Sequence, residues 1–119
     1  MTGFDFDGLK RAMEGSDAAA LGKLYAEDAE MTIVDSDRPP GAPMQLRGRA
    51  AILAYWEDVC GRAMTHNLAR EVIGPERVAF VEECAYPDGC NVLAAMTLDL
   101  RDGQIARHLT VQAWDQTAP

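Results

Sequence analysis

An aspartate and two histidines are the residues of this chain best suited to proton transfer. Asp35 follows an apolar, β-like segment, and by the period of two it shares a face with Met31 and Ile33, so its carboxylate would enter the same space. His108 lies in a late segment where polar and apolar residues alternate. Imidazole titrates near neutral pH. We therefore interpret Asp35 as a candidate general base and His108 as its proton partner, with His66 as a third candidate.

Each of these residues also has a purely structural interpretation. Asp35 would open a loop and cap the turn toward Asp37. His108 would lie on the outer face of a sheet, in a subunit interface, and His66 would be a surface or capping histidine. The sequence leaves these alternatives open.

A second group of side chains could hold a ligand beside the proton-transfer residues. Phenol, indole, thioether, hydroxyl and amide groups can line an apolar cavity and orient what enters it. For Tyr55 and Trp56, packing in the core is the alternative interpretation. The candidate substrate-binding residues are Tyr25, Tyr55, Trp56, Met96, Thr110 and Gln112.

Length and charge exclude several classes of protein. A chain of 119 residues fits one compact domain, expected to span residues 1–119. A formal net charge of −8, with scattered basic residues, argues against nucleic acid as a partner. No stretch is long and apolar enough to span a bilayer, and no basic-then-apolar leader is seen. We expect a cytoplasmic protein.

The cysteines and histidines indicate neither a disulfide framework nor a zinc site. Cys60, Cys84 and Cys90 are an odd number without a C-x-x-C pair, which is typical of reduced thiols. The two histidines add no zinc-ligand spacing. We expect no metal and no organic cofactor.

Apolar spacing predicts three helices in the first half of the chain. Gly15 can end the first helix, Ser16 or Asp17 can cap the second, and Asp28 breaks its pattern. The third predicted helix carries the widest apolar stripe, so this long helix must pack against a broad surface. The stripes are Phe6, Leu9 and Met13; Leu21, Leu24 and Tyr25; and Ile52, Tyr55, Trp56, Val59 and Cys60.

The rest of the chain favours β-strands. Residues 36–43 hold three prolines and a glycine and predict a loop. Turn sequences rich in Gly, Pro and Asp separate the later strands and predict an antiparallel meander. Helices first and strands later indicate an α+β fold with helices on one face of a curved sheet. The expected strands are residues 30–34, 64–73, 78–85, 91–100 and 105–114.

Three segments in this order resemble the SnoaL-like family of the nuclear transport factor 2-like superfamily, which includes ketosteroid-isomerase-like proteins. They are Leu24-Tyr25-Ala26-Glu27-Asp28-Ala29, Arg47-Gly48-Arg49-Ala50-Ala51-Ile52 and Arg101-Asp102-Gly103-Gln104-Ile105. The resemblance covers about residues 7–115. It implies a cone: a curved, antiparallel or mixed sheet wrapped around a long helix, with an interior pocket and dimers through the sheet. It also turns the His108 face toward that pocket.

The chain departs from the isomerase pattern where that pattern stabilises an enolate. Leu9 and Met96 stand where the resemblance places a tyrosine and a protonated aspartate. Without those donors, efficient steroid isomerisation is not expected. The Arg-x-Asp pair of epoxide hydrolases is also missing, since Asp99 and Arg101 run in the reverse order.

Three functions remain after these exclusions. The first is acid/base catalysis of the isomerase, cyclase or dehydratase (lyase) type on a small apolar carbonyl compound. The second is non-catalytic binding of an apolar small molecule. The third is a dimeric interaction module whose cone is filled by side chains. In each case we expect a homodimer, because both faces of the later strands carry apolar residues.

Overall fold

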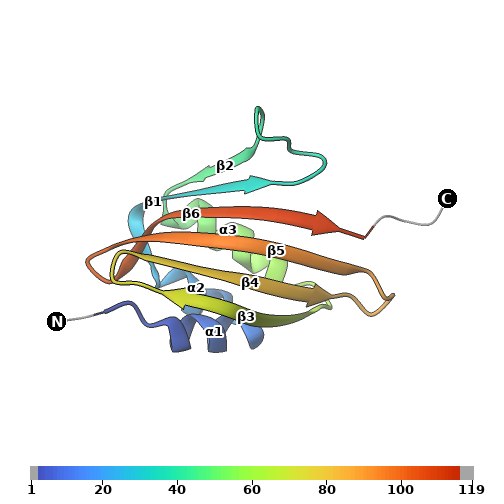
Figure 1. Ribbon diagram of the computed structural model, residues 1–119, viewed down its shortest axis with the longest axis horizontal. Coiled ribbons are helices and arrows are strands. Elements are labelled where there is room, and N and C mark those ends of the chain that lie inside the picture. Colours follow the sequence, from blue (N-terminus) through green and yellow to red (C-terminus); the bar gives the residue numbers. More distant parts are fainter. Residues whose placement is uncertain (1–2, 116–119) are drawn as a thin grey trace.

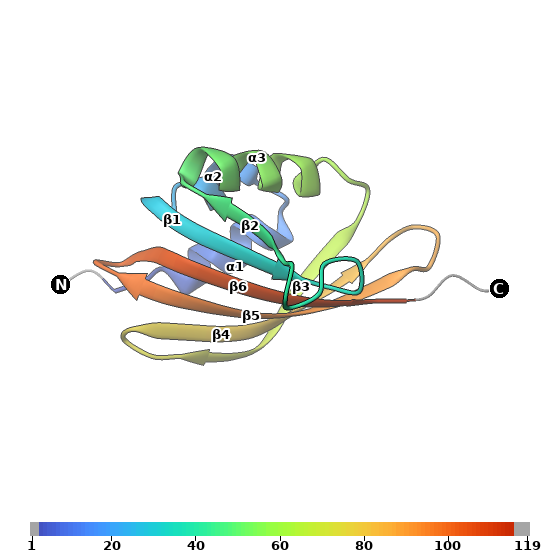
Figure 2. The same ribbon diagram turned by 90° about the horizontal axis from the view of Figure 1, so that it is seen from above.

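Three helices lie against one face of a curved six-stranded sheet in the computed structural model, which describes residues 3–115 (Figure 1). Seen from above, the helices form one layer and the opposite face of the sheet is bare (Figure 2). No helix within these residues has the length and apolar content to cross a membrane. The elements are α1 (Phe6–Glu14), α2 (Ala18–Gly22), β1 (Tyr25–Val34), β2 (Met44–Arg47), α3 (Arg49–Cys60), β3 (Thr65–Ile73), β4 (Arg77–Ala85), β5 (Asn91–Arg101) and β6 (Gln104–Trp114).

The sheet is mixed, with the strand order β2-β1-β6-β5-β4-β3. Strands β3 to β6 form an antiparallel meander, as their turn sequences predict. β1 pairs with the last strand, β6, in parallel, and β2 pairs with β1 in antiparallel. The expected α+β fold with a curved sheet around a long helix is therefore confirmed.

The core fills the space between α3 and the concave face of the sheet. On β4 and β5 every second residue is buried, so each strand sends one set of side chains inward. From α3, Ile52, Trp56 and Val59 meet this face. The buried set includes polar side chains, namely His66, Glu82, His108 and Thr110.

Helix α1 protects the free edge of the sheet at β3. The Lys10 ammonium donates to the Leu68 carbonyl at 3.1 Å, and the Glu14 carboxylate accepts from the Leu68 amide at 3.0 Å. Both backbone groups of Leu68 would otherwise be available to a foreign strand. This contact also lowers the pKa of Glu14 below its usual value.

The second helix ends earlier than its apolar spacing predicts, so the placement of Tyr25 on a helix is wrong. The helix stops at Gly22, and Tyr25 begins β1 instead. The Leu24 carbonyl accepts from the Ile105 amide at 2.9 Å, and the Tyr25 carbonyl accepts from Arg49 Nε at 2.9 Å. The apolar spacing favours a longer helix, but α2 is short and ends in glycine, a poor helix former. Pairing with β6 therefore decides the structure at Tyr25.

Strand β2 is absent from the expectation, which passes from the proline-rich loop directly to the long helix. It is only four residues long and pairs with the second half of β1, Met31 facing Leu46. A segment this short carries too few alternations to be recognised. The four later strands lie within one residue of their expected ends.

Candidate functional site

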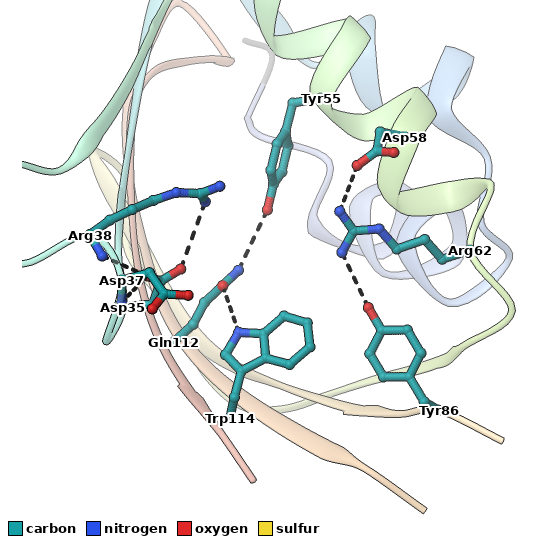
Figure 3. Close-up of polar contacts among 9 residues, drawn as sticks. All are labelled: Asp35, Asp37, Arg38, Tyr55, Asp58, Arg62, Tyr86, Gln112 and Trp114. Atoms are coloured by element: carbon teal, nitrogen blue, oxygen red, sulfur yellow. Dashed lines mark hydrogen bonds and ion pairs between the residues drawn. The ribbon is translucent and has the colours of Figure 1, made fainter. Parts of the chain in front are cut away.

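An open groove of about 420 Å³ lies where the loop after β1, the end of α3 and the end of β6 come together (Figure 3). We call it the outer groove. Tyr55 points from the helix toward Gln112 and Trp114 on β6, and charged residues flank it on both sides (Figure 3). Its lining is Asp35, Ser36, Asp37, Arg38, Met44, Tyr55, Asp58, Arg62, Gln112 and Trp114.

A much smaller cavity of about 20 Å³, the inner chamber, lies beside this groove on the side of the core. Tyr55, Arg62, Gln112 and Trp114 line both spaces, so these four side chains separate them. The chamber has room for about one water molecule. Its remaining lining is Trp56, Val59, Met64, His66, Glu82, Cys84, Tyr86, Val92 and Ala94.

The partition between the two spaces contains one weak contact, between Gln112 and Tyr55. Gln112 Nε2 donates to the Tyr55 hydroxyl at 3.5 Å, and Trp114 Nε1 donates to Gln112 Oε1 at 3.1 Å. The first distance is at the limit of a hydrogen bond. Burial raises the pKa of Tyr55 to about 12, so its hydroxyl stays protonated at neutral pH. Tyr55 can therefore donate a hydrogen bond to a ligand oxygen.

Charged pairs border the outer groove on each side. Arg38 lies 3.7 Å from Asp35. Across the groove, Arg62 donates to Asp58 at 2.6 Å and to the Tyr86 hydroxyl at 3.2 Å. The guanidinium groups are thus already matched by carboxylates, and the lining carries more acidic than basic residues. This balance favours neutral over anionic ligands.

Three reactive side chains meet in the wall of the inner chamber: His66, Glu82 and Cys84. His66 Nδ1 lies 3.0 Å from Glu82 Oε2 and 3.5 Å from Cys84 Sγ. The His66 and Glu82 side chains are 1% and 5% exposed. Burial, together with the nearby Glu82 carboxylate, raises the pKa of the Cys84 thiol.

Strand register brings these three residues together. On β4, Glu82 and Cys84 belong to the inward set that begins with Val78 and Phe80. His66 on β3 stands directly opposite Cys84. Residues that face each other across antiparallel strands have neighbouring side chains on the same face. The cluster therefore depends on the β3–β4 pairing and not on spacing along the sequence.

The two ring nitrogens of His66 have different surroundings. Nδ1 faces the Glu82 carboxylate, which can only accept when ionised, so the ring proton belongs on Nδ1. Nε2 is buried and has no hydrogen-bond partner among residues 3–115. A carboxylate that holds one nitrogen and leaves the other with a free lone pair is the arrangement of a general base and its orienting group.

Asp35, the expected base, is engaged in the turn that follows β1. Its Oδ1 accepts from the Asp37 amide at 3.0 Å and from the Arg38 amide at 2.9 Å, and its side chain is 11% exposed. The carboxylate lines the outer groove. These contacts favour the turn-capping interpretation.

His108 faces the interior but does not meet Asp35. Trp56 Nε1 donates to the Tyr25 hydroxyl at 3.1 Å, which leaves the phenol proton for His108 Nδ1 at 2.8 Å. Nε2 then donates to Thr110 Oγ1 at 2.8 Å. Burial lowers the pKa of His108 to about 3, so the ring is neutral at physiological pH. With both nitrogens engaged, it is a poor partner for proton transfer.

The expected ligand-binding residues separate into two groups. Tyr55, Trp56 and Gln112 line the inner chamber. Tyr25, Met96 and Thr110 are buried in the core and line neither the chamber nor the outer groove. The structure brings His66 to the chamber and adds Glu82, which the sequence does not point to, and Cys84, which the sequence indicates only as a reduced thiol. No sequence signal identifies them, because both alternating sets of residues on β4 contain apolar side chains.

Comparison with solved structures supports this architecture. An NTF2-like protein of unknown function from Mesorhizobium loti superposes with a TM-score of 0.79 at 19% identity, covering 91% of this chain and 87% of that one. A SnoaL-like protein of unknown function from Burkholderia thailandensis gives 0.70 at 21%, covering 90% and 89%. A loop truncation variant of IdmH gives 0.68 at 24%, covering 90% and 88%.

At these identities the similarities establish the fold alone. A search of curated proteins finds no significant match. The model of the SnoaL-like domain matches residues 7–108, which include both histidines and the whole of the His66–Glu82–Cys84 cluster. The chain therefore belongs to the SnoaL-like domain family.

Proposed function

We propose that this protein is an acid/base enzyme of the isomerase, cyclase or dehydratase type, acting on a small, mostly apolar carbonyl compound. The observation that carries the proposal is the buried His66–Glu82 pair in the wall of a chamber that shares four lining side chains with an open groove. Glu82 orients His66, and Nε2 takes a proton from the carbon next to the carbonyl. This assigns the base to His66 in place of Asp35.

The hydroxyl of Tyr55 is suited to the second half of such chemistry. It lines both cavities and stays protonated at neutral pH because burial raises its pKa. A donor of this kind can stabilise charge that develops on a carbonyl oxygen. The substrate enters when the weak Tyr55–Gln112 contact opens and joins the two spaces.

Proton exchange in heavy water tests the proposal without knowledge of the substrate. A panel of small ketones, enones and β-keto esters is incubated with the protein in D₂O, and the loss of α-proton signals is followed by NMR. The wild type is expected to accelerate exchange for at least one compound. His66→Asn keeps a donor toward Glu82 but removes Nε2, and should lower the rate by about 10²–10⁴-fold.

Asp35→Asn discriminates between the two candidate bases. If His66 is the base, this variant changes apparent affinity at most, because Asp35 only borders the groove. Loss of exchange in Asp35→Asn with retention in His66→Asn would return the base to Asp35. Thermal stabilisation by a compound that shows no exchange would identify a binding protein instead.

We further propose that the protein works in the cytoplasm as a homodimer through the bare face of its sheet. The outward side chains Leu93, Leu109 and Val111 are 52%, 42% and 47% exposed. Beside them lie acidic and basic residues in equal number, Glu30 and Asp99 with Arg77 and Arg107. A face with both apolar and balanced charged parts can complement its own copy about a twofold axis.

Sedimentation velocity tests this dimer. The wild type is expected to be dimeric at micromolar concentration, and Val111→Glu to be monomeric, because the charge would be buried without a partner. Ile73→Glu is the matched control, since Ile73 is 57% exposed but stands opposite Val78 of the inward set, on the other face of the sheet. A monomeric wild type refutes the proposal.

A further inference from the structure

We propose that His66, Glu82 and Cys84 form a binding site for a thiophilic divalent cation such as Zn²⁺, and that its occupation switches off the base. The cation site stands on the cluster's geometry. The switching effect rests on the proposed function, because it requires His66 to act through Nε2.

The three donor atoms are close to the spacing of a tetrahedral site. They lie within 4.8 Å of one another, with 3.0 Å between His66 Nδ1 and Glu82 Oε2 and 3.5 Å between Nδ1 and Cys84 Sγ. Zinc bonds of about 2.0–2.3 Å place neighbouring ligand atoms about 3.3–3.6 Å apart. A cation would therefore need the Nδ1–Oε2 contact to open by a few tenths of an ångström, and the Oε2–Sγ separation, which is within 4.8 Å, to match the same range.

The charge and the softness of the donors also fit. A carboxylate, a thiolate and a neutral imidazole together carry two negative charges, which a divalent cation neutralises. Such a site can be buried without an uncompensated charge. A thiolate beside an imidazole selects zinc-like ions over magnesium or calcium, which prefer oxygen ligands.

The inner chamber supplies the fourth position. All three donor residues line it, and its volume of about 20 Å³ holds one water molecule. Three protein ligands and one water form an open zinc site. The cation would enter from the outer groove between Tyr55, Gln112 and Trp114, which line both spaces.

Cation binding disables the base through the tautomer of His66. The cation occupies Nδ1, the atom that now faces Glu82. The protons of Nδ1 and of the Cys84 thiol leave, and one proton returns to Nε2, so one proton is released to solvent. The lone pair of Nε2 is then used, and it can no longer accept a proton from a substrate.

Titration of the metal-free wild-type protein with Co²⁺ tests the site. Cobalt in a tetrahedral thiolate site gives intense visible bands and a thiolate-to-metal charge-transfer band. We expect both bands, and their loss when Zn²⁺ is added. Cys84→Ser should weaken binding more than about 100-fold, because changes even outside the ligand set cost 10–100-fold. Cys90→Ser, a half-buried thiol outside the cluster, should leave the bands unchanged.

A readout on the wild type guards against a variant that fails to fold. In ¹⁵N NMR of the histidine rings, Zn²⁺ should move the His66 proton from Nδ1 to Nε2 and leave His108 unchanged. A charge-transfer band of equal strength in folded Cys84→Ser, or a His66 ring unaffected by Zn²⁺, overturns the site. Exchange catalysis unaffected by bound Zn²⁺ overturns only the switch, and exchange without cation binding leaves the proposed function standing.

Discussion

A Glu82→Gln variant is expected to lose α-proton exchange by about 10²–10⁴-fold while it keeps its fold. Glutamine has nearly the shape of glutamate, but its amide group can donate to His66 Nδ1. The ring would then keep its lone pair on Nδ1 and carry its proton on Nε2. His66 would stay in place, but Nε2 would carry a proton and could not accept one from the substrate. The variant would thus lose its base and keep its structure.

Ring ¹⁵N spectra separate this effect from simple destabilisation. The chain has only two histidines, so the spectrum is simple. In the wild type we expect opposite tautomers: the proton on Nδ1 of His66, opposite Glu82, and on Nε2 of His108, opposite Thr110. In Glu82→Gln, both rings should carry the proton on Nε2.

Glu83→Gln is the matched control for this substitution. Glu83 is the next residue on β4 and is exposed on the other face of the sheet. Its Oε1 accepts a hydrogen bond from Asn67 Nδ2 at 2.8 Å. Its substitution should change neither the exchange rate nor the ring spectrum. An unchanged rate or an unchanged His66 tautomer in Glu82→Gln would show that Glu82 does not orient the base.

Much of the fold is predictable because local patterns and the final structure agree along the later strands. Alternation and turn residues place β3 to β6 within one residue of their observed ends. The errors fall at β1 and β2, where pairing between distant segments decides the structure. Tyr25 continues a helical spacing, yet it pairs with Ile105, 80 positions later, as a strand residue. No local pattern contains that pairing.

The candidate site is less predictable because it depends on which face of each strand is buried. On β4 both faces of the strand carry apolar residues, Val78 and Phe80 on one and Ala79 and Val81 on the other. The sequence therefore gives no reason to place Glu82 inside and Glu83 outside. Once the sheet is formed, the face on which Glu82 lies places its carboxylate beside His66.

The two histidines illustrate how surroundings determine the role of one residue type. Both are buried, but His108 has a partner on each nitrogen, whereas one nitrogen of His66 has no partner within the described part of the chain. The partners of His108 belong to a chain of hydrogen bonds that runs from Trp56 through Tyr25 to Thr110. These hydrogen-bonded side chains are buried in the core. His108 therefore has a structural role there.

Tyr25→Phe should therefore lower the free energy of unfolding by about 2–6 kcal/mol, because it leaves two buried polar groups without a partner, and each costs about 1–3 kcal/mol. Trp56 Nε1 would lose its acceptor and His108 Nδ1 its donor. The melting temperature should fall by roughly 8–24 °C for a domain of this size. Tyr55→Phe makes the same chemical change at the groove, where only a 3.5 Å contact is lost, and should cost far less. Urea denaturation of both variants measures the difference. If both variants lose the same small amount of unfolding free energy, the hydrogen bonds among Trp56, Tyr25 and His108 contribute little to stability. The burial of Tyr25 would then depend on its ring alone.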